Sequence, residues 1–482
     1  MPSHQSADPP GQRFVIVGGG LAGLAAAEAL VAGSGPGRRV TLVEPAGRCG
    51  GVLGTTHRDG WLIERSADCF LAARPEGIAL VERLGIEREL VGVDPRVRRA
   101  LVWHRGRTVP VPQGFRLLAP GRLAGILGSP LLSPVGKLRV LAERLVRPRR
   151  TGAEESLEAF ATRRLGREAF ERLVQPLAAG IWTADPAKLG MEAACPEFLA
   201  LERQWGSLGA GERARLAATS EAGEATGARY GQFVTFANGM ETLPRRLVER
   251  LEGRGVDIVS ARAERLFRDA SGWNVVVAPA GAGATSVLAA DAVIVAVPPA
   301  AAAVLLAAVD PAAAAELAGI ACAGSAIVSL GWQRDAVAHP LDAAGLVVPR
   351  VAGRRALAIS FSSSKFPHRA PAGCVLVRVF LGGALDPDAL ALDDDALVAL
   401  ARHEAAVLLG ASGEPLVVQV DRWVGVMPQY HVGHAARIDL LEAALAAHPG
   451  LALAGAAYRG VGIPQVIASG RAAAERVVQP AP

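Results

Sequence analysis

The sequence predicts an α/β protein, and three observations lead to this prediction. An apolar run at residues 14–17 is followed by a glycine-rich loop and by a helical period over 21–32. From residue 114 to about 207 the chain consists of helical periods rich in Leu and Arg. The C-terminal part, 451–478, again has the pattern of a strand, a glycine loop and a helix. We therefore expect an α/β domain built from separated parts of the chain, an α+β domain, and an inserted helical domain.

Length and composition limit the class of protein. A chain of 482 residues suggests about three domains, and 51% apolar against 20% charged residues is too hydrophobic for intrinsic disorder. Basic residues exceed acidic ones only by 51 to 46 and are dispersed, so we expect no nucleic-acid partner. Five cysteines without a CxxC pair argue against a disulfide framework or a zinc ribbon. The first ten residues, MPSHQSADPP, lack the apolar segment of a secretory signal, so we expect a cytoplasmic protein.

The individual elements follow from periodicity. Strands at 14–17 and 40–43 flank a helix at 21–32, which makes one β-α-β unit. The α/β pattern resumes after a charged, Ala/Gly-rich stretch at 209–227, which we expect to be a connector. A helix at 243–251, a strand at 256–259, alternation at 273–277 and an apolar run ending at 297 extend the sheet. Short apolar runs over 335–380 predict an antiparallel sheet, and 394–409 predicts a helix.

One apolar stretch has nearly the length of a membrane span. Ala292 to Val309 contains no charged residue, but Pro298 and Pro299 interrupt it. A helix cannot continue regularly through a proline pair. We therefore expect a buried strand, a turn and a helix there instead of a span.

The strongest local motif is FVIVGGGLAGLAAAEAL, in which Gly18, Gly20 and Gly23 form GxGxxG between a strand and a helix. Such a loop turns tightly, lets the backbone approach a pyrophosphate, and directs the N–H groups of the helix start at the phosphates. Glu44 ends the second strand, where a carboxylate accepts hydrogen bonds from ribose hydroxyls. The spacing predicts dinucleotide binding by Glu44 and by the loop residues Gly18, Gly19, Gly20, Leu21, Ala22 and Gly23.

Two further features favour FAD over NAD. The glycine pair Gly50-Gly51 follows Arg48 at the spacing that flavoproteins use to bring backbone against pyrophosphate and flavin. No second strand-GxGxxG-helix pattern is found, so the chain has no evident domain for a nicotinamide cofactor. We expect Arg48, Gly50 and Gly51 to contribute to an FAD site, and the electrons to come from the substrate.

Several segments resemble a known family. RCGGVLGTTHRDGWLIERSADCF (48–70) is similar to the GG-doublet flavoproteins, which include amine oxidases and phytoene desaturases. The segments at 155–189, 361–371, 422–434 and 454–477 resemble the bacterial protoporphyrinogen or coproporphyrinogen III oxidases. The similarity runs in order over nearly the whole chain.

The resemblance implies a domain organisation. It implies a discontinuous Rossmann-like FAD-binding domain at 11–80, 228–300 and 440–478. An α+β substrate-binding domain would comprise 81–113 and 301–439. The helical region at 114–227 would contact a membrane, because Leu and Ile clusters alternate with arginines over 114–146. Localisation is then cytoplasmic, or peripheral on the inner face of the cell membrane.

The resemblance also implies residue roles. The backbone of Val461, Gly462 and Ile463 would face the isoalloxazine, Trp423 would lie beside the flavin, and the backbone of Ala263 would meet adenine. Three arginines before the strand at 101–103 would bind the propionates of the substrate: Arg96, Arg98 and Arg99.

Neither a catalytic residue nor a metal ligand is assigned, because the cofactor supplies most of the chemistry. His431 and His434 are interpreted as surface or loop-packing residues, and Lys365 is either a loop anchor or a substrate contact. Three departures from the family pattern affect the choice of substrate: Ser66-Ala67, Ala456 and Gln465.

The resemblance predicts a protoporphyrinogen oxidase that catalyses a six-electron oxidation within heme biosynthesis. Oxygen is the favoured electron acceptor, and a quinone is the alternative. Three alternatives stay open: a coproporphyrinogen III oxidase, an amine oxidase or desaturase, and a non-catalytic flavin-fold partner protein. The chain has only three tyrosines, which makes the aromatic cage of an amine oxidase harder to build.

Overall fold

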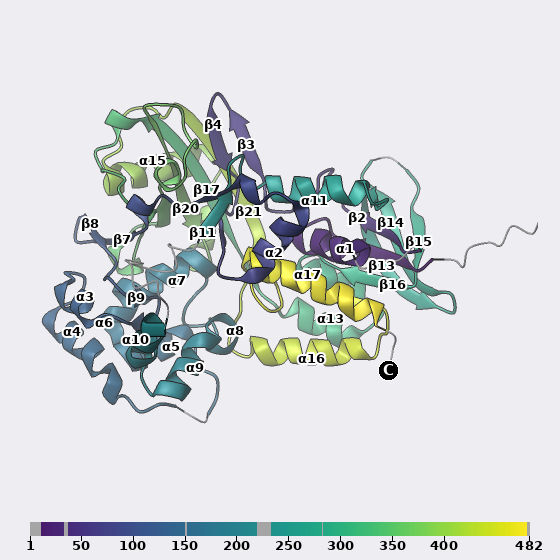
Figure 1. Ribbon diagram of the computed structural model, residues 1–482, viewed down its shortest axis with the longest axis horizontal. Helices are drawn as coiled ribbons and strands as arrows, with labels where there is room; N and C mark the ends of the chain where they lie inside the picture. Colours follow the sequence, from purple (N-terminus) through teal and green to yellow (C-terminus); the bar gives the residue numbers. More distant parts are fainter. Residues whose placement is uncertain (1–10, 33–36, 150–151, 219–232, 282, 480–482) are drawn as a thin grey trace, which may run out of the picture.

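The computed structural model describes residues 11–32, 37–149, 152–218, 233–281 and 283–479. The first ten residues, residues 219–227 of the predicted connector and one of the three tyrosines, Tyr230, lie outside the described residues. Figure 1 shows a parallel sheet with its helices at one end of the molecule and a large sheet beside a helical region at the other. The domain bounds given above stay a prediction.

A parallel sheet forms the first part of the fold. Its five strands, all parallel, lie in the order β12 (Asp257–Val259), β2 (Arg39–Val43), β1 (Arg13–Val17), β16 (Ala292–Val295) and β22 (Leu451–Leu453). These strands confirm the predicted N-terminal unit and its extension by the strand at 256–259 and the apolar run ending at 297. The alternating run at 273–277 was also expected to extend this sheet, but it belongs to a separate three-stranded sheet. Successive residues of β1 face opposite sides, as a strand requires. Phe14 and Ile16 pack with helices on one side, and Val15 and Val17 belong to a second core on the other.

Helices and a small sheet cover the two faces. One face is covered by α1 (Leu21–Ala32), α2 (Pro75–Leu84), α11 (Thr242–Glu252) and α17 (Ile463–Val478). The other face is covered by β13 (Ala261–Asp269), β14 (Gly272–Pro279), β15 (Ser286–Ala290), α12 (Pro299–Leu306), α13 (Pro311–Ala318) and α16 (His434–Ala446). The apolar stretch 292–309 is β16, a proline turn and α12, as predicted. Within the described residues, the structure contains no helix long and apolar enough to cross a bilayer.

A seven-stranded sheet forms the second part. Its order is β21 (Val417–Pro428), β17 (Cys322–Gln333), β20 (Cys374–Gly382), β19 (Ala356–Ser360), β18 (Gly345–Val347), β7 (Ala100–His104) and β8 (Arg107–Pro110). The antiparallel pairing predicted for 335–380 is confirmed by β18, β19 and β20. Strand β7, from an earlier part of the chain, pairs with β18 in parallel. Helix α15 (Asp394–Leu409) covers one face. On the other face, Trp61 and Ile63 of the hairpin β3 (Thr55–Arg58) and β4 (Trp61–Glu64) pack against Leu376 and Val417.

The inserted region is helical, as predicted. It consists of α3 (Leu123–Gly128), α4 (Pro134–Leu141), α5 (Leu157–Leu165), α6 (Arg167–Ala169), α7 (Gln175–Trp182), α8 (Met191–Ala194), α9 (Pro196–Trp205) and α10 (Leu208–Ala218). The region also contains a two-stranded sheet of β9 (Phe115–Arg116) and β10 (Ala119–Pro120). Outside it, β5 (Phe70–Leu71), β11 (Phe233–Phe236) and β6 (Leu90–Gly92) form a three-stranded sheet. Figure 1 shows these helices clustered beside the seven-stranded sheet.

Helix α10 corrects one expectation. The stretch from 209 was expected to be a connector because of its glycines and charges, but the chain is helical through Ala218. Gly211 permits close packing, since a Cβ there would lie 2.7 Å from Leu201 Cδ2 of α9. Glu212 is buried and pairs with Arg116 at 2.8 Å. Tertiary packing therefore overrides the low helix propensity of the glycines.

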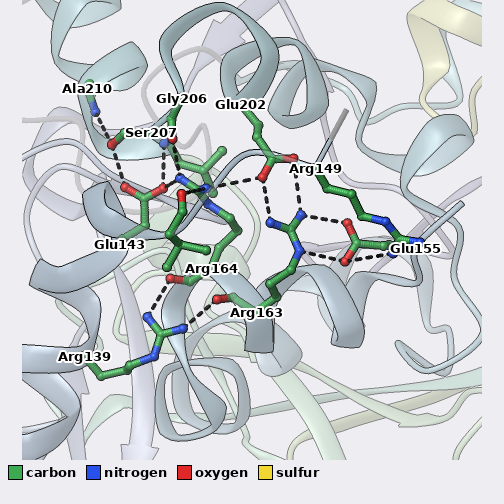
Figure 2. A network of polar contacts seen from close by, with 12 residues as sticks. Arg139, Glu143, Arg149, Glu155, Arg163, Arg164, Glu202, Gly206, Ser207 and Ala210 are labelled. Carbon is green, nitrogen blue, oxygen red and sulfur yellow. Dashed lines mark hydrogen bonds and ion pairs between the residues drawn. The ribbon is translucent and has the colours of Figure 1, made fainter. Parts of the chain in front are cut away.

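A buried charge network ties the helical region together (Figure 2). The guanidinium of Arg164 is fully buried and contacts the carboxylates of Glu143 and Glu202. Arg163 bridges Glu202 at 2.8 Å and Glu155 at 2.7 Å. Because buried charges are tolerated only with partners, this network fixes how α5 and α9 lie relative to residue 143.

Candidate active site

The loops after β1, β16 and β22 leave the parallel sheet at one edge. Gly18 N–H donates to Val43 O at 2.8 Å, Ala296 N–H to Val17 O at 2.7 Å, and Ala454 N–H to Val295 O at 3.0 Å. Ligands of open α/β sheets bind outside the carboxyl ends of the strands. This edge is therefore the candidate site, and it brings the N-terminal and C-terminal glycine loops together.

The geometry of the first loop requires its glycines. Gly18 has a φ of +111°, and a Cβ at Gly23 would lie 1.9 Å from Gly18 O. Gly20 differs, because a Cβ there would meet no atom within 4 Å. Packing of the protein thus explains Gly18 and Gly23, whereas the space beside Gly20 is free for a ligand. A pyrophosphate approaching the backbone fits this space.

The glycine pair lies directly against this loop. Gly50 N–H donates to Gly19 O at 2.8 Å, and a Cβ on Gly51 would lie 3.3 Å from Gly20 Cα. Arg48 holds the pair in place by donating to Gly51 O at 2.7 Å. It also donates to the carbonyl of Leu53 at 3.0 Å. The structure therefore brings the two predicted glycine motifs into one surface.

Glu44 lies at the end of β2, as predicted. Its carboxylate accepts the N–H of Gly19 at 2.7 Å and that of Ala46 at 2.9 Å. These bonds orient the carboxylate at the loop, and each oxygen has a second lone pair for a ribose hydroxyl.

The C-terminal loop joins two cores. Val461 packs against the core of the helical region, and Ile463 packs against the core beneath α1. The hydroxyl of Tyr430 donates to Ala456 O at 2.6 Å and accepts the N–H of Gly460 at 2.7 Å. Burial raises the pKa of this tyrosine. The loop that contains the predicted residues 461–463 is thus held by one buried phenol.

The other predicted contacts are placed as follows. Trp423 of β21 donates its indole N–H to Arg65 O at 2.8 Å, which joins the seven-stranded sheet to the segment after the glycine pair. Ala263 lies at an irregularity of the pairing between β13 and β14. The roles of both residues toward a cofactor stay predictions.

The three arginines expected to bind propionates lie together before β7. Arg96 is exposed and pairs with Asp94 at 2.7 Å, and Arg99 pairs with Asp342. The guanidinium of Arg98 donates to the carbonyl of residue 93. Two of the three guanidinium groups thus have carboxylate partners, and the substrate contact stays a prediction.

Histidine and lysine side chains of the motifs also have defined positions. Lys365 is buried and pairs with Asp68 at 2.9 Å, so it anchors its loop. His434 is buried and stacks on Tyr430 with ring centroids 4.1 Å apart. Burial lowers the pKa of His434 to about 4. It is a loop-packing residue, as predicted.

A group of buried charges lies beside the site. Its member Glu64 belongs to the segment 48–70 that resembles the flavoproteins, but its surroundings with Arg369 and Arg378 were missed by the sequence analysis. Glu64 is buried, accepts the N–H of Met240 at 3.0 Å and lies 3.6 Å from Arg369. Burial raises the pKa of Glu64 to about 7. Arg378 of β20 and Arg369 are both buried. No local pattern indicated this group, because the partners are distant in the sequence.

The chain is similar in sequence to flavin-containing oxidoreductases. The model of the family "Flavin containing amine oxidoreductase" matches residues 21–478. The coproporphyrinogen III oxidase of Bacillus subtilis is 33% identical over 467 residues, covering 96% of this chain and 97% of that protein. The chloroplastic protoporphyrinogen oxidase of Nicotiana tabacum is 30% identical, and the match covers 89% of this chain and 78% of that protein.

Solved structures agree with the fold. A crystal structure from Exiguobacterium sp. 255-15, provisionally named a protoporphyrinogen oxidase, is 29% identical with a TM-score of 0.83. It covers 97% of this chain and 99% of that one. A reduced UDP-galactopyranose mutase has a TM-score of 0.71 at 16% identity, covering 97% and 95%, which supports the fold alone.

Proposed function

Because the chain belongs to the flavin-containing amine oxidoreductase family, we propose that it is a porphyrinogen oxidase of heme biosynthesis with protoporphyrinogen IX as its substrate. Family membership confirms three predictions: an FAD cofactor, an oxidoreductase and a Rossmann-like α/β fold. One observation supports the substrate class most. The relatives that match nearly the whole chain at about a third identity are named as porphyrinogen oxidases.

The proposed reaction converts one porphyrinogen and three O₂ into one porphyrin and three H₂O₂. Six hydrogen atoms leave the macrocycle in three rounds, and bound FAD supplies the two-electron redox chemistry of each round. The open backbone at Gly20 would receive the pyrophosphate, and Glu44 would bind the ribose. Val461 to Ile463 would present backbone to the ring, with the α17 N-terminus favouring negative charge there. The chain's own contribution is positioning and exclusion of water.

A second substrate, coproporphyrinogen III, is favoured by a specific observation. Three bacterial relatives, from Bacillus subtilis, Propionibacterium freudenreichii and Staphylococcus aureus, are named coproporphyrinogen III oxidases. Coproporphyrinogen has four propionates and protoporphyrinogen has two, so the two compounds differ in how many cations they require. Purified protein should be given each porphyrinogen under air, and the rate of porphyrin fluorescence should be compared. Faster turnover of coproporphyrinogen III would replace our assignment by this one.

The same preparation tests the remaining alternatives. Amine oxidases share the fold at low identity, such as cyclohexylamine oxidase from Brevibacterium oxydans at 17%. Peroxide release from an amine alone would favour that class. Bound flavin that neither porphyrinogen nor amine reduces under anaerobic conditions would indicate a non-catalytic partner protein.

We also propose peripheral membrane contact by the surface of α3, α4 and the turn at 142–145. Large apolar side chains are exposed there, and the most exposed are Val135 at 75%, Leu138 at 66% and Leu145 at 76%. The exposed or half-exposed charged side chains of residues 122–147 are all basic, since Glu143 is buried. Apolar side chains among cations suit an anionic bilayer surface.

Flotation with anionic vesicles tests this contact. We expect the protein to float, and the double variant Leu138→Gln, Leu145→Gln to float less. Leu440→Gln is a matched control, because Leu440 is 60% exposed but lies on α16. Protein that stays entirely in the soluble fraction would contradict the proposal.

A further inference from the structure

Residues 64–69 form the link between the glycine pair and the seven-stranded sheet. Arg65 N–H donates to Gly54 O at 2.9 Å, and a Cβ at Gly54 would lie 3.4 Å from an Nη of Arg48. Toward the sheet, Arg65 donates to Asp421 at 2.8 Å and its carbonyl accepts the N–H of Trp423. The segment is therefore linked through Gly54 to Arg48 of the glycine-pair loop on one side and contacts β21 on the other.

Arg378 is the central cation on the sheet side. It lies in β20, only 1% exposed, and its guanidinium donates to Ser66 O. A second nitrogen lies 3.4 Å from Asp68, which also pairs with Lys365. Although burial works in the opposite direction, Lys365 and Arg378 hold the pKa of Asp68 well below its ordinary range. The carboxylate is therefore ionised, and the segment is clamped by charge-assisted bonds.

The charges of this group do not cancel. We define the charged seam as seven side chains in mutual contact or linked through this segment: Glu64, Arg65, Asp68, Lys365, Arg369, Arg378 and Asp421. Four are cationic and three are carboxylates, so one positive charge is in excess when all are ionised. The neighbouring pair of Arg48 and Glu241, 3.9 Å apart, is balanced. Most of these side chains are nearly inaccessible to solvent, so water screens the excess poorly.

We propose that the charged seam is a positioning and electrostatic element of the cofactor site, in which Arg378 fixes residues 65–68 beside the flavin and the excess positive charge favours electron uptake. Arg378 and Asp68 are positioning residues in this proposal. The inference rests on the proposed function, because it takes Trp423 and the glycine pair to be flavin contacts. According to this proposal, residues at 64–68 and residues at 365–421 both influence how readily the flavin is reduced.

Two substitutions should move this equilibrium in opposite directions. Arg378→Met removes a buried positive charge and should lower the ratio of reduced to oxidised flavin at a fixed dye potential. Asp68→Asn is nearly isosteric and removes a negative charge, which raises the excess of positive charge. It should therefore increase the ratio of reduced to oxidised flavin. A unit charge acting over about 10 Å at an effective dielectric of about 20 changes an equilibrium constant by roughly tenfold. For a two-electron couple, tenfold corresponds to about 30 mV.

The measurement is a redox titration of the purified holoenzyme against a reference dye, without porphyrinogen. Arg354→Met is the control, because Arg354 also pairs with a buried carboxylate, Glu404, at 3.0 Å but on the α15 side of the sheet. We expect the control to match the unchanged protein. A purely structural role would shift Arg378→Met and Asp68→Asn in the same direction, and that outcome would overturn the proposal.

The two proposals fail in different ways. Flavin that titrates identically in all variants refutes the seam but leaves the porphyrinogen assay untouched. Protein that takes up no FAD refutes the cofactor site itself, and with it the proposed function. If Arg378→Met does not fold, Arg378→Lys keeps the charge, and its reduction ratio should stay within about twofold of the unchanged protein while Asp68→Asn still rises.

Discussion

Gly20→Ala should separate cofactor binding from folding. The Cβ of this alanine would meet no atom of the protein within 4 Å, and Gly20 does not have the left-handed φ of Gly18. Alanine also restricts the unfolded chain, which stabilises a protein by about 0.4–1 kcal/mol where the backbone allows it. We therefore expect the apoprotein to unfold at the same temperature as the unchanged apoprotein, or at a slightly higher one.

The same methyl group should weaken FAD binding. It would occupy the space that the pyrophosphate needs, and overpacking of one methyl group costs about 1–3 kcal/mol. At about 1.4 kcal/mol per tenfold, FAD should bind roughly tenfold to hundredfold more weakly. Titration of the apoproteins with FAD, followed by quenching of flavin fluorescence, measures the two dissociation constants.

Two further glycines serve as comparisons. A Cβ at Gly23 would lie 1.9 Å from Gly18 O, so Gly23→Ala should lower the melting temperature of the apoprotein. Gly92, in β6, also has nothing within 4 Å of a Cβ, and Gly92→Ala should change neither property. Gly20→Ala protein that binds FAD normally would refute our assignment of the open backbone to the cofactor.

Three other outcomes follow from the structure. Because the pKa of Glu64 is about 7 in the folded protein and about 4.5 in the unfolded chain, its stabilising contribution is complete below pH 4.5 and is lost as pH rises through 7. Glu64→Gln should remove about 3 kcal/mol of this pH dependence, measured as unfolding free energy against pH. Arg164→Met should cost about 3–5 kcal/mol because it leaves buried carboxylates without a cation, whereas Arg167→Met, at exposed ion pairs, should change the melting temperature little. Tyr430→Phe should speed the loss of FAD and lower stability by about 1–3 kcal/mol. Tyr458→Phe should do neither, because the buried hydroxyl of Tyr458 has no hydrogen-bond partner among the described residues.

Local patterns explain why much of the fold was predictable. The strands of the parallel sheet and the helix at 394–409 have clear periodicity, and glycine roles at Gly18 and Gly23 follow from backbone sterics alone. Helix α10 was missed because its glycines resemble a loop. In the structure they permit close packing, Gly209 near Pro120 O and Gly211 against α9.

Contacts between distant residues were not predictable. Asp68 and Lys365 are separated by 297 positions, and no property of either residue alone indicates the other. The clamp on residues 64–69 depends on how the seven-stranded sheet meets the glycine pair, which is a matter of tertiary structure. The arginines at 96–99 were identified as a cluster, but their carboxylate partners were not.

The most direct test of the proposed function mixes purified, FAD-loaded protein with protoporphyrinogen IX in the absence of oxygen. We predict that the absorbance of the oxidised flavin is lost within the time of one turnover. Admission of air should then restore this absorbance while porphyrin fluorescence grows. Flavin that stays oxidised with protoporphyrinogen IX and with coproporphyrinogen III, in protein that binds FAD stoichiometrically, would contradict the assignment of this chain as a porphyrinogen oxidase.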